Sequence, residues 1–474
     1  MPSLTRKIAL NAITQMTGKI MSTIFGLLSV ALMTRYLGQT GFGGYTTIIA
    51  FLQFFGILVD MGLSLTVIQM ISPEGAPVKK IMSNIFTLRF FSALIFLGLA
   101  PLIVLFFPYP PLIKLGVAIT TISFFCISLH QVLVGVFQKN LRMDKVALAE
   151  VVGRIVLLAS IFSAIILKTG LLGVMAAVVL GGVTNFLITY LFSLKYVKIS
   201  FEFDFGLWKE IITRTWPIAL SIAFNLVYLK ADIIILSLYK SQAEVGIYGA
   251  TYRVLEIIIT FPIMFIGLIL PLLTQSWAEK NLEKFKVIMQ KSFDALIIIT
   301  APLVVGTLFL ARPIMILIAG PQFAASGDVL KIIIFATGII FIGSLFGHTI
   351  VAINKQRLMI WGYFATAVVG LICYLIFIPR YSYFGAAFST VFTEALIGTI
   401  CFWVVWRTTR FFPSLKVFGK SILASFVMAG FLYFLNEINL FLLIMIAVFS
   451  YFSILYLIKG FSKELVKEII KIRV

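Results

Sequence analysis

The sequence predicts an all-α integral membrane protein with about 14 transmembrane helices. Apolar stretches long enough to cross a bilayer recur about fourteen times along the 474 residues. Lys and Arg collect in every second gap between those stretches. The connections are short, so we expect no soluble domain of any size between the helices.

The expected helices follow from the length of the apolar stretches. A helix needs roughly 20 apolar residues to cross ~30 Å of hydrocarbon at ~1.5 Å per residue. In chain order, the stretches are residues 10–34, 44–69, 83–107, 113–137, 148–167, 171–194, 215–239, 246–273, 292–318, 329–352, 359–378, 384–406, 417–436 and 439–459. We expect the first one to be retained as a helix, because it is too long for a signal-peptide core and lacks a small-residue cleavage site.

Composition supports the membrane class. The chain is 61% hydrophobic, 12% charged and contains 46 Phe, more apolar surface than a water-soluble fold can bury. The three cysteines, Cys126, Cys373 and Cys401, lie on apolar stretches without paired spacing. We therefore expect them to be small core hydrophobes, and we predict no disulfide and no metal site.

The net charge of +20 follows the expected topology. The amino-terminal segment with Arg6 and Lys7, every second gap after it and the carboxyl-terminal tail together hold 26 basic residues. The remaining gaps hold 6. The positive-inside rule then places both termini in the cytoplasm of a multi-pass protein of the inner or plasma membrane. The basic excess serves topology first and attraction to anionic membrane lipids second. We expect no nucleic-acid partner.

Ionisable side chains also fall inside the predicted spans, where a charge costs between ~2.5 and more than 10 kcal/mol. Two pairs at helical spacing, Glu150 with Arg154 and Arg253 with Glu256, can form local ion pairs. Snorkelling to a span end explains Arg89 and Lys331 nearly as well as a functional role. The bases are Lys19, Arg89, Arg154, Lys230, Arg253 and Lys331, and the acids include Asp60, Glu150, Asp232, Glu256 and Glu394.

Polar stripes accompany several of these charges. Lys19 is the tenth residue of the first span, or roughly 15 Å deep, near the midplane. Stripes on several spans cannot all face lipid, so we expect them to line a shared hydrated cavity. Interhelical hydrogen bonds, worth ~0.6 kcal/mol each, are the alternative. The predicted polar lining is Asn11, Gln15, Ser22, Gln53, Asn225, Tyr228 and His348.

An internal repeat predicts two lobes. The segment Tyr36–Tyr45 recurs as Tyr239–Tyr248, shifted by 203 residues, and Leu172-Gly173 recurs as Phe384-Gly385, shifted by 212. Six spans separate the copies, so both halves cross the membrane in the same sense, as in a parallel repeat. We predict two pseudo-symmetric six-helix lobes, residues 1–200 and 201–412, followed by 413–474 with two added helices and a basic cytoplasmic tail.

The motifs around these elements resemble a known family. The amino-terminal half carries Asn11…Gly26…Arg35-Tyr-Leu-Gly38…Gly41…Tyr45 and Asp60-Met-Gly62-Leu63, and the second half carries Val245-Gly-Ile-Tyr248…Arg253…Glu256, Pro271-Leu-Leu and Tyr383-Phe-Gly-Ala-Ala387. Over essentially the whole chain, these residues are similar to the Wzx-type polysaccharide flippases. Those flippases belong to the superfamily of multidrug, oligosaccharidyl-lipid and polysaccharide exporters, which also contains the MATE drug exporters and the MurJ lipid II flippases.

The resemblance implies a MATE/MurJ-like fold with a central cavity. It also implies that the protein moves undecaprenyl-diphosphate-linked oligosaccharide from the inner to the outer leaflet by alternating access, for surface polysaccharide biosynthesis. A polysaccharide polymerase and chain-length proteins are the expected partners. The residues agree with such a cargo, because its phosphates require Arg or Lys. All six intramembrane bases are candidate substrate ligands, with Lys19, Arg89 and Arg253 ranked first.

The sequence leaves open which energy source drives transport. No GxxxxGK[ST] phosphate loop is present, and the loops are too short for an ATPase domain. The acids Asp60, Asp232, Glu256 and Glu394 are candidates to bind H⁺ or Na⁺ and couple it to movement of the lobes. Charge balance against the intramembrane bases is the alternative. We expect no other cofactor.

Two other transporters and one enzyme class compete with this function. A cation-coupled multidrug exporter has the same fold, but six intramembrane bases do not suit cationic drugs, and such exporters usually have twelve helices. Lipid II transport is a close variant that the sequence leaves open. A membrane glycosyltransferase or polymerase would show a long loop with clustered Asp, His or Arg, and this chain has none. We therefore do not expect an enzyme.

Overall fold

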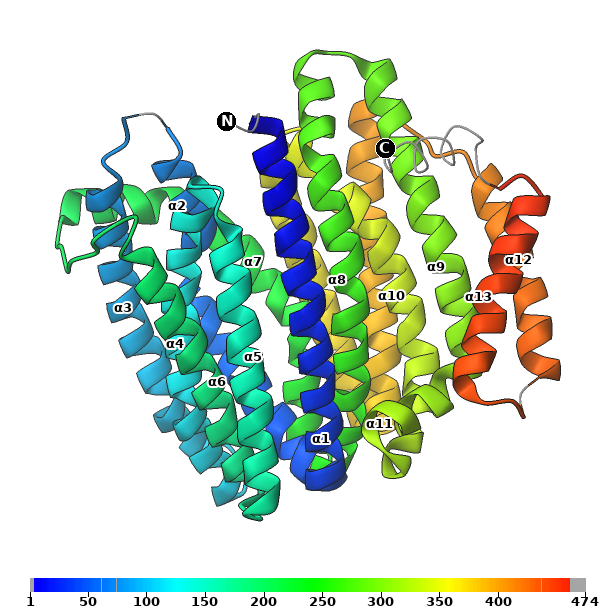
Figure 1. The fold of residues 1–474 in the computed structure, drawn as a ribbon, viewed down its shortest axis with the longest axis horizontal. Helices are drawn as coiled ribbons and strands as arrows, with labels where there is room; N and C mark the ends of the chain where they lie inside the picture. The colour runs from blue at the N-terminus through cyan, green and yellow to red at the C-terminus, as the bar shows by residue number, and fades with distance from the viewer. Residues whose placement is uncertain (1–3, 61, 74, 436, 461–474) are drawn as a thin grey trace. The chain divides into compact units, whose positions relative to one another are not determined.

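The chain forms α-helices almost throughout. The computed structural model describes residues 4–60, 62–73, 75–435 and 437–460, with side chains over the same residues except 4–13, 65, 217 and 218. These ranges contain no β-strand. The helices are α1 (Leu4–Asp60), α2 (Leu63–Ile71), α3 (Val78–Ile103), α4 (Pro111–Lys139), α5 (Met143–Ile166), α6 (Gly170–Ser193), α7 (Phe205–Tyr239), α8 (Gln242–Ala278), α9 (Leu282–Ala319), α10 (Ala324–Ala352), α11 (Gln356–Thr409), α12 (Lys416–Phe434) and α13 (Leu440–Leu457) (Figure 1).

The number of membrane-spanning segments agrees with the sequence. Twelve helices in the described part of the chain are long and apolar enough to cross a membrane. Two of them are each a pair of helices joined at a non-helical residue, Gly38 in α1 (φ 66°) and Ser382 in α11 (φ 53°). Divided at these residues, the twelve helices give fourteen segments, as predicted.

The predicted second span is interrupted. The sequence predicts one helix over residues 44–69, but α1 ends at Asp60 and the short helix α2 begins at Leu63. Gly62 between them adopts the left-handed conformation (φ 75°), which Gly accepts without a steric penalty. Hydropathy averaged over a span does not detect such a break, because the stretches on both sides of it are predominantly apolar. Other helices extend past the apolar stretches: α7 begins at Phe205, ahead of residue 215, where Asp204 caps the backbone N–H of Leu207.

The helices form two compact units, which we describe separately. The first contains the described residues up to Ala250 together with Ile318–Gly320 and Tyr374–Ser382, and the second contains the rest of the described chain. The predicted lobe boundaries at residues 200 and 412 stay a prediction.

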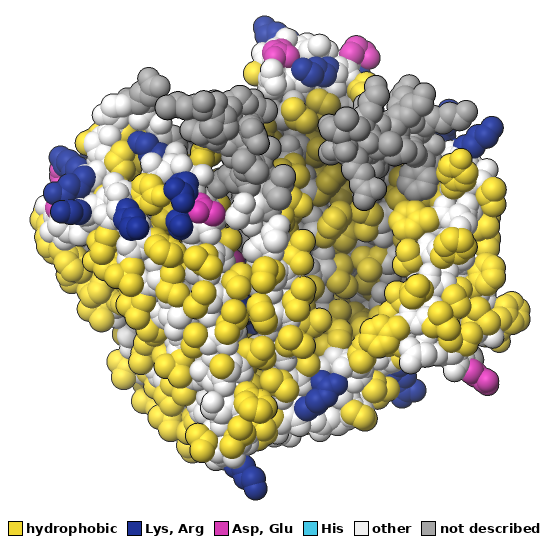
Figure 2. Space-filling view, in the orientation of Figure 1, with side chains coloured by type: hydrophobic (Ala, Val, Ile, Leu, Met, Phe, Trp, Pro, Cys, Tyr) yellow, Lys and Arg dark blue, Asp and Glu magenta, His cyan; other side chains and the backbone are white. Residues whose placement is uncertain are grey.

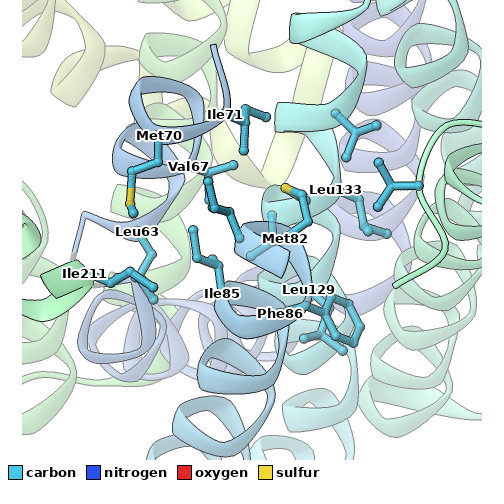
Figure 3. Packing of buried hydrophobic residues seen from close by; sticks show 14 residues of the cluster. Leu63, Val67, Met70, Ile71, Met82, Ile85, Phe86, Leu129, Leu133 and Ile211 are labelled. Atoms are coloured by element: carbon cyan, nitrogen blue, oxygen red, sulfur yellow. The ribbon is translucent and has the colours of Figure 1, made fainter. Parts of the chain in front are cut away.

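In the first unit, α5 packs against α1 and α6, and α6 packs against α4. A buried apolar cluster attaches the short helix α2 to this bundle. It joins Val67 and Ile71 of α2 to Met82 of α3, Leu133 of α4 and Ile211 of α7 (Figure 3). Hydrophobic side chains also cover the outer flank of α3–α6, with charged side chains towards the helix ends (Figure 2). This distribution suits helices surrounded by lipid.

In the second unit, α12 and α13 pack side by side and contact α9 (Figure 1). Their shared core contains Met428 of α12, Leu443 and Tyr451 of α13 and Ile298 of α9. The hydroxyl of Tyr451 donates to the carbonyl oxygen of Ile298 at 2.8 Å. The two added helices predicted at the end of the chain are therefore attached to α9.

The internal repeat forms a close helix crossing inside the first unit. Gly43 of α1 and Gly246 of α8 are 203 residues apart in sequence. A Cβ atom on Gly43 would overlap the carbonyl oxygen of Gln242, and one on Gly246 would overlap that of Gln39. Gln39 and Gln242 are also 203 residues apart, so the two copies meet through equivalent residues. Only glycine permits this approach of one backbone to another.

Candidate functional site

The first group of charged side chains lies between α1 and α5. Nζ of Lys19 donates to Oε1 of Glu150 at 3.1 Å, and the two side chains are 42% and 27% exposed. Close packing of Gly18 against Ala147 brings the two helices together beside this pair. Because Glu150 pairs with Lys19, the local pair with Arg154 expected from the sequence spacing does not form among the described residues.

Arg154 is the exposed cation of this group. It follows Glu150 by one helical turn on α5. Its Nη1 lies beside α1, within 3.9 Å of where a Cβ on Gly26 would stand. No ion pair or hydrogen bond of the Arg154 side chain is found within the described part of the chain. The group Lys19, Glu150 and Arg154 therefore carries a net charge of +1 on candidate membrane spans.

The predicted polar lining of α1 is partly buried. Ser22 is buried and Gln53 is half-buried. Oγ of Ser22 and Oε1 of Gln53 have no hydrogen-bond partner within the described residues. Gln15 is exposed, and the Asn11 side chain lies outside the described residues. Buried polar atoms normally find a partner, so the two orphaned oxygens mark places where water or a ligand can bind.

Arg89 lies at the centre of a buried hydrogen-bond network and does not face an open cavity or the surface. It is 0% exposed. Its guanidinium donates to Oδ1 of Asp60 at 2.7 Å, to the carbonyl oxygen of Val59 at 3.0 Å, to Oγ of Ser128 at 2.7 Å and to Oε1 of Gln131 at 2.6 Å. Asp60 also accepts from the Ser64 hydroxyl at 2.6 Å. Arg89 thus joins the interruption between α1 and α2 to α4.

The polar side chains of α7 form hydrogen bonds within the first unit. Asp232 is buried and accepts from the Tyr248 hydroxyl at 2.6 Å. Nδ2 of Asn225 donates to the Tyr228 hydroxyl at 2.7 Å, and the backbone oxygen of Tyr228 accepts from Tyr374. Lys230 is half-buried on the same helix. Tyr248 belongs to the internal repeat and to the family motif that begins at Val245, and these two sequence signals pointed to it.

In the second unit, the predicted bases are held by acids. Arg253 pairs with Glu256 at 2.7 Å, which confirms the local ion pair as a contact. Lys331 lies 3.4 Å from Asp328, which is three residues away on the same helix but was not among the predicted acids. Nδ1 of His348 lies 2.8 Å from the carbonyl oxygen of Ser344, on its own helix.

Glu394 differs from the other predicted acids. It lies on the second half of α11 and is 6% exposed. Its Oε1 has no hydrogen-bond partner, and no ion pair of Glu394 is found among the described residues. Nor does any group of three or more His, Cys, Asp or Glu side chains in those residues have the arrangement of a metal site.

Outside the spans, a polar network attaches the segment before α7 to α3. Lys80 lies 2.7 Å from Asp204, and its hydrogen bond holds the pKa of that carboxyl below its ordinary value. Oδ1 of Asn84 accepts from the backbone N–H of Asp204 at 2.8 Å and from the Trp208 indole at 3.1 Å. Sequence reasoning missed these residues because each is an ordinary polar residue beside a span.

Comparison with known proteins supports a transporter family. Residues 8–277 match the family model described as "Polysaccharide biosynthesis protein", and residues 217–376 match the MatE model. The capsular polysaccharide biosynthesis protein CapF of Staphylococcus aureus is 26% identical over 220 residues, covering 45% of this chain and 54% of CapF. The probable low-salt glycan biosynthesis flippase Agl15 of Haloferax volcanii is 25% identical over 170 residues, covering 36% of each chain.

A third relative, the succinoglycan biosynthesis transport protein ExoT of Rhizobium meliloti, is 23% identical over 265 residues, covering 52% of this chain and 48% of ExoT. The chain thus spans about half the length of the curated relatives it matches, or less.

Solved structures show the same fold. The lipid II flippase MurJ, in an inward closed conformation, superposes with a TM-score of 0.77 at 16% identity, covering 93% of this chain and 98% of MurJ. An inward-facing MATE multidrug transporter gives a TM-score of 0.68 at 14% identity, covering 84% of this chain and 98% of the transporter. These likenesses confirm the predicted all-α, MATE/MurJ-like membrane fold.

Proposed function

Because the chain belongs to the polysaccharide biosynthesis protein family, we propose that it is a flippase for undecaprenyl-diphosphate-linked oligosaccharide. In this proposal it moves the glycolipid from the cytoplasmic to the outer leaflet by alternating access. It acts as a transporter and not as an enzyme. CapF, Agl15 and ExoT are named for capsule, glycan and succinoglycan biosynthesis, which supports a surface polysaccharide as the destination of the sugar.

The observation that carries this proposal is the group of Lys19, Glu150 and Arg154 on α1 and α5. A surplus positive charge on apolar helices is costly unless an anion accompanies it. The diphosphate of a lipid-linked oligosaccharide supplies that anion, and a guanidinium can bind two phosphate oxygens at once. We therefore assign the headgroup contact to Arg154 and Lys19, with Glu150 holding Lys19 in place between cargo molecules.

The other predicted bases have different roles in this proposal. The network around Arg89 makes it a positioning residue, which holds the interruption between α1 and α2. Arg253 and Lys331 must leave Glu256 and Asp328 before they can bind a phosphate. Lys230 is a further candidate contact from α7.

Location and partners follow from the same proposal. The chain is a multi-pass membrane protein, and we place it in the inner or plasma membrane with both termini in the cytoplasm. The polysaccharide polymerase and chain-length proteins that use the delivered sugar are its proposed partners. An anionic lipid surface attracts the basic cytoplasmic loops.

One observation favours a second candidate function. The MatE match over residues 217–376 is compatible with a cation-coupled multidrug exporter. The charge of the α1–α5 group opposes that function, because a cationic drug would be repelled by Arg154. The likeness to MurJ shows the fold alone, so lipid II is an alternative cargo within the proposed class.

Purified protein in proteoliposomes separates these functions. Fluorescent undecaprenyl-diphosphate oligosaccharide, lipid II and a cationic dye would each be offered under the same conditions. We expect translocation of the oligosaccharide lipid, with no efflux of dye. Dye efflux without glycolipid movement would overturn the proposal in favour of an exporter, and translocation of lipid II alone would change the cargo.

A further inference from the structure

The four acids predicted to bind a coupling ion have different surroundings. Asp60 is paired with Arg89 and Glu256 with Arg253, at 2.7 Å in each case. Asp232 accepts a hydrogen bond from the Tyr248 hydroxyl at 2.6 Å. A cation or a donor beside a carboxylate favours its ionised form. Three of the acids thus have a cation or a hydroxyl donor as a partner, and Glu394 is the exception.

Glu394 is 6% exposed, and the helix contacts one to two turns along from it are apolar. The second half of α11 contacts α10 where Gly398 meets Ile339 and Gly343, and it contacts the first half of α11 where Ile400 meets Gly362. An ionised carboxylate without a partner in such a place is strongly disfavoured, so the neutral acid is the stable form there.

No positively charged group pairs with Glu394 in the described structure. Cys401 lies two turns along the same helix and is close enough to interact electrostatically with Glu394. Tyr363 follows Gly362 on the first half of α11. On α10, His348 contacts the backbone oxygen of Ser344, and Lys331 lies beside Asp328. Within the described residues, none of these groups forms an ion pair or a hydrogen bond with Glu394.

Oε1 of Glu394 has no partner among the described residues, so a single proton is enough to satisfy it. A hard cation requires several oxygen ligands. The hydroxyls of Thr390 and Thr393 on the same helix already donate to the backbone oxygens of Ala386 and Thr390. The orphaned Oε1 is therefore an isolated acceptor, which a single proton neutralises.

We propose that Glu394 is the proton-binding site of this transporter, loaded in the described conformation and emptied when α10 and α11 separate. This proposal rests on the proposed transport function for its coupling role, whereas the proton site itself rests on the burial of Glu394. Binding adds H⁺ to the carboxylate to give the neutral acid, and release returns both. Because only the neutral acid fits the closed packing, closure requires the proton, and the proton gradient thereby biases the cycle.

Infrared spectroscopy of the purified protein and glycolipid transport test the two parts of the proposal. The variant Glu394→Gln keeps the shape of the neutral acid but cannot release a proton. Glu437→Gln, at an exposed glutamate between α12 and α13, is the matched control. The carbonyl band of a buried protonated carboxylic acid would be recorded for each protein. Steady-state distribution of glycolipid between leaflets would be measured with and without a pH difference of about one unit.

We expect the protonated-acid band in the native protein and in Glu437→Gln, and its loss in Glu394→Gln. A pH difference of about one unit is a tenfold difference in proton activity, so exchange of one proton per cycle shifts the leaflet ratio by up to ~tenfold. We expect that shift in the native protein and no shift in Glu394→Gln.

Persistence of the band in Glu394→Gln would overturn the proton site. Loss of the band with an unchanged response to pH, or a response to a Na⁺ gradient at constant pH, would overturn the coupling role. If the band belongs to Glu394 but neither the native protein nor Glu437→Gln moves glycolipid, the proton site stands and the proposed cargo fails. The two failures are therefore distinguishable.

Discussion

The network around Arg89 gives the sharpest prediction about stability. Replacing Arg89 with Met fills much of its volume but removes the guanidinium from Asp60, Ser128 and Gln131. Breaking one side of a buried ion pair typically costs ~3–5 kcal/mol, because the other charge stays buried without compensation. The side chain of Arg89 is 1% exposed and that of Asp60 is 18% exposed, so solvent screening reduces this cost little. We expect Arg89→Met to lose about that much stability.

Apparent melting temperature in detergent measures the effect. For a unit of this size, ~1 kcal/mol corresponds to ~2–4 °C, so we expect a fall of roughly 6–20 °C. The matched control is Arg214→Met, which removes an exposed arginine paired with Glu210 at 2.6 Å and should change stability by less than ~1 kcal/mol.

A double-mutant cycle with Asp60→Asn tests the cause. Once Arg89 is gone, the Asp60 charge has lost its partner, so removing that charge should cost less or even restore stability. We expect a coupling of ~1–3 kcal/mol. Equal effects of Arg89→Met and Arg214→Met, or strict additivity in the cycle, would refute the reasoning. A stable Arg89→Met protein that no longer binds glycolipid would instead make Arg89 a headgroup contact.

Three further predictions concern other parts of the chain. Gly43→Ala places a methyl group against the backbone of α8 and should destabilise the protein by ~1–3 kcal/mol, whereas Gly98→Ala, with open space around it, should be neutral or slightly stabilising; thermal unfolding compares the two. Tyr248→Phe deprives the buried Asp232 of a donor and should cost ~1–3 kcal/mol, measured the same way, and an unchanged melting temperature would count against the bond. The lowered pKa of Asp204 means that its contribution to attaching the segment before α7 is present above its ordinary value of 3.8 and is lost as pH falls through the lowered pKa. Protection of residues 200–208 against hydrogen exchange, corrected for the intrinsic exchange rate at each pH, should fall with acid in the native protein and be low at every pH in Asp204→Asn.

The sequence predicted the fold well because its signals are strong. Apolar length and the alternation of basic gaps determine the number and order of spans, and all fourteen segments are present in the described structure. The interruption at Gly62 was missed, since a single left-handed residue leaves no trace in hydropathy. Gly43 and Gly246 were visible as a repeat, but their close approach depends on how distant segments pack.

The candidate site was only partly predictable. Composition and helical spacing selected Lys19, Glu150 and Arg154. They did not show that Glu150 would pair with Lys19 and not with Arg154. That choice depends on the approach of α1 to α5, which sequence spacing within one helix cannot report. For the same reason, Arg89 was ranked as a substrate contact although its partners on α1 and α4 enclose it.

The rate of glycolipid translocation by Arg154→Ala tests the central claim most directly. Arg154 is exposed, so the variant should fold normally, and Arg214→Ala is the control for loss of an exposed arginine. Hydrogen bonds between charged groups contribute ~1.5–3 kcal/mol, so we predict a fall of roughly 10- to 100-fold in transport of undecaprenyl-diphosphate oligosaccharide. Equal rates for Arg154→Ala and Arg214→Ala would contradict the assignment of the diphosphate to α1 and α5.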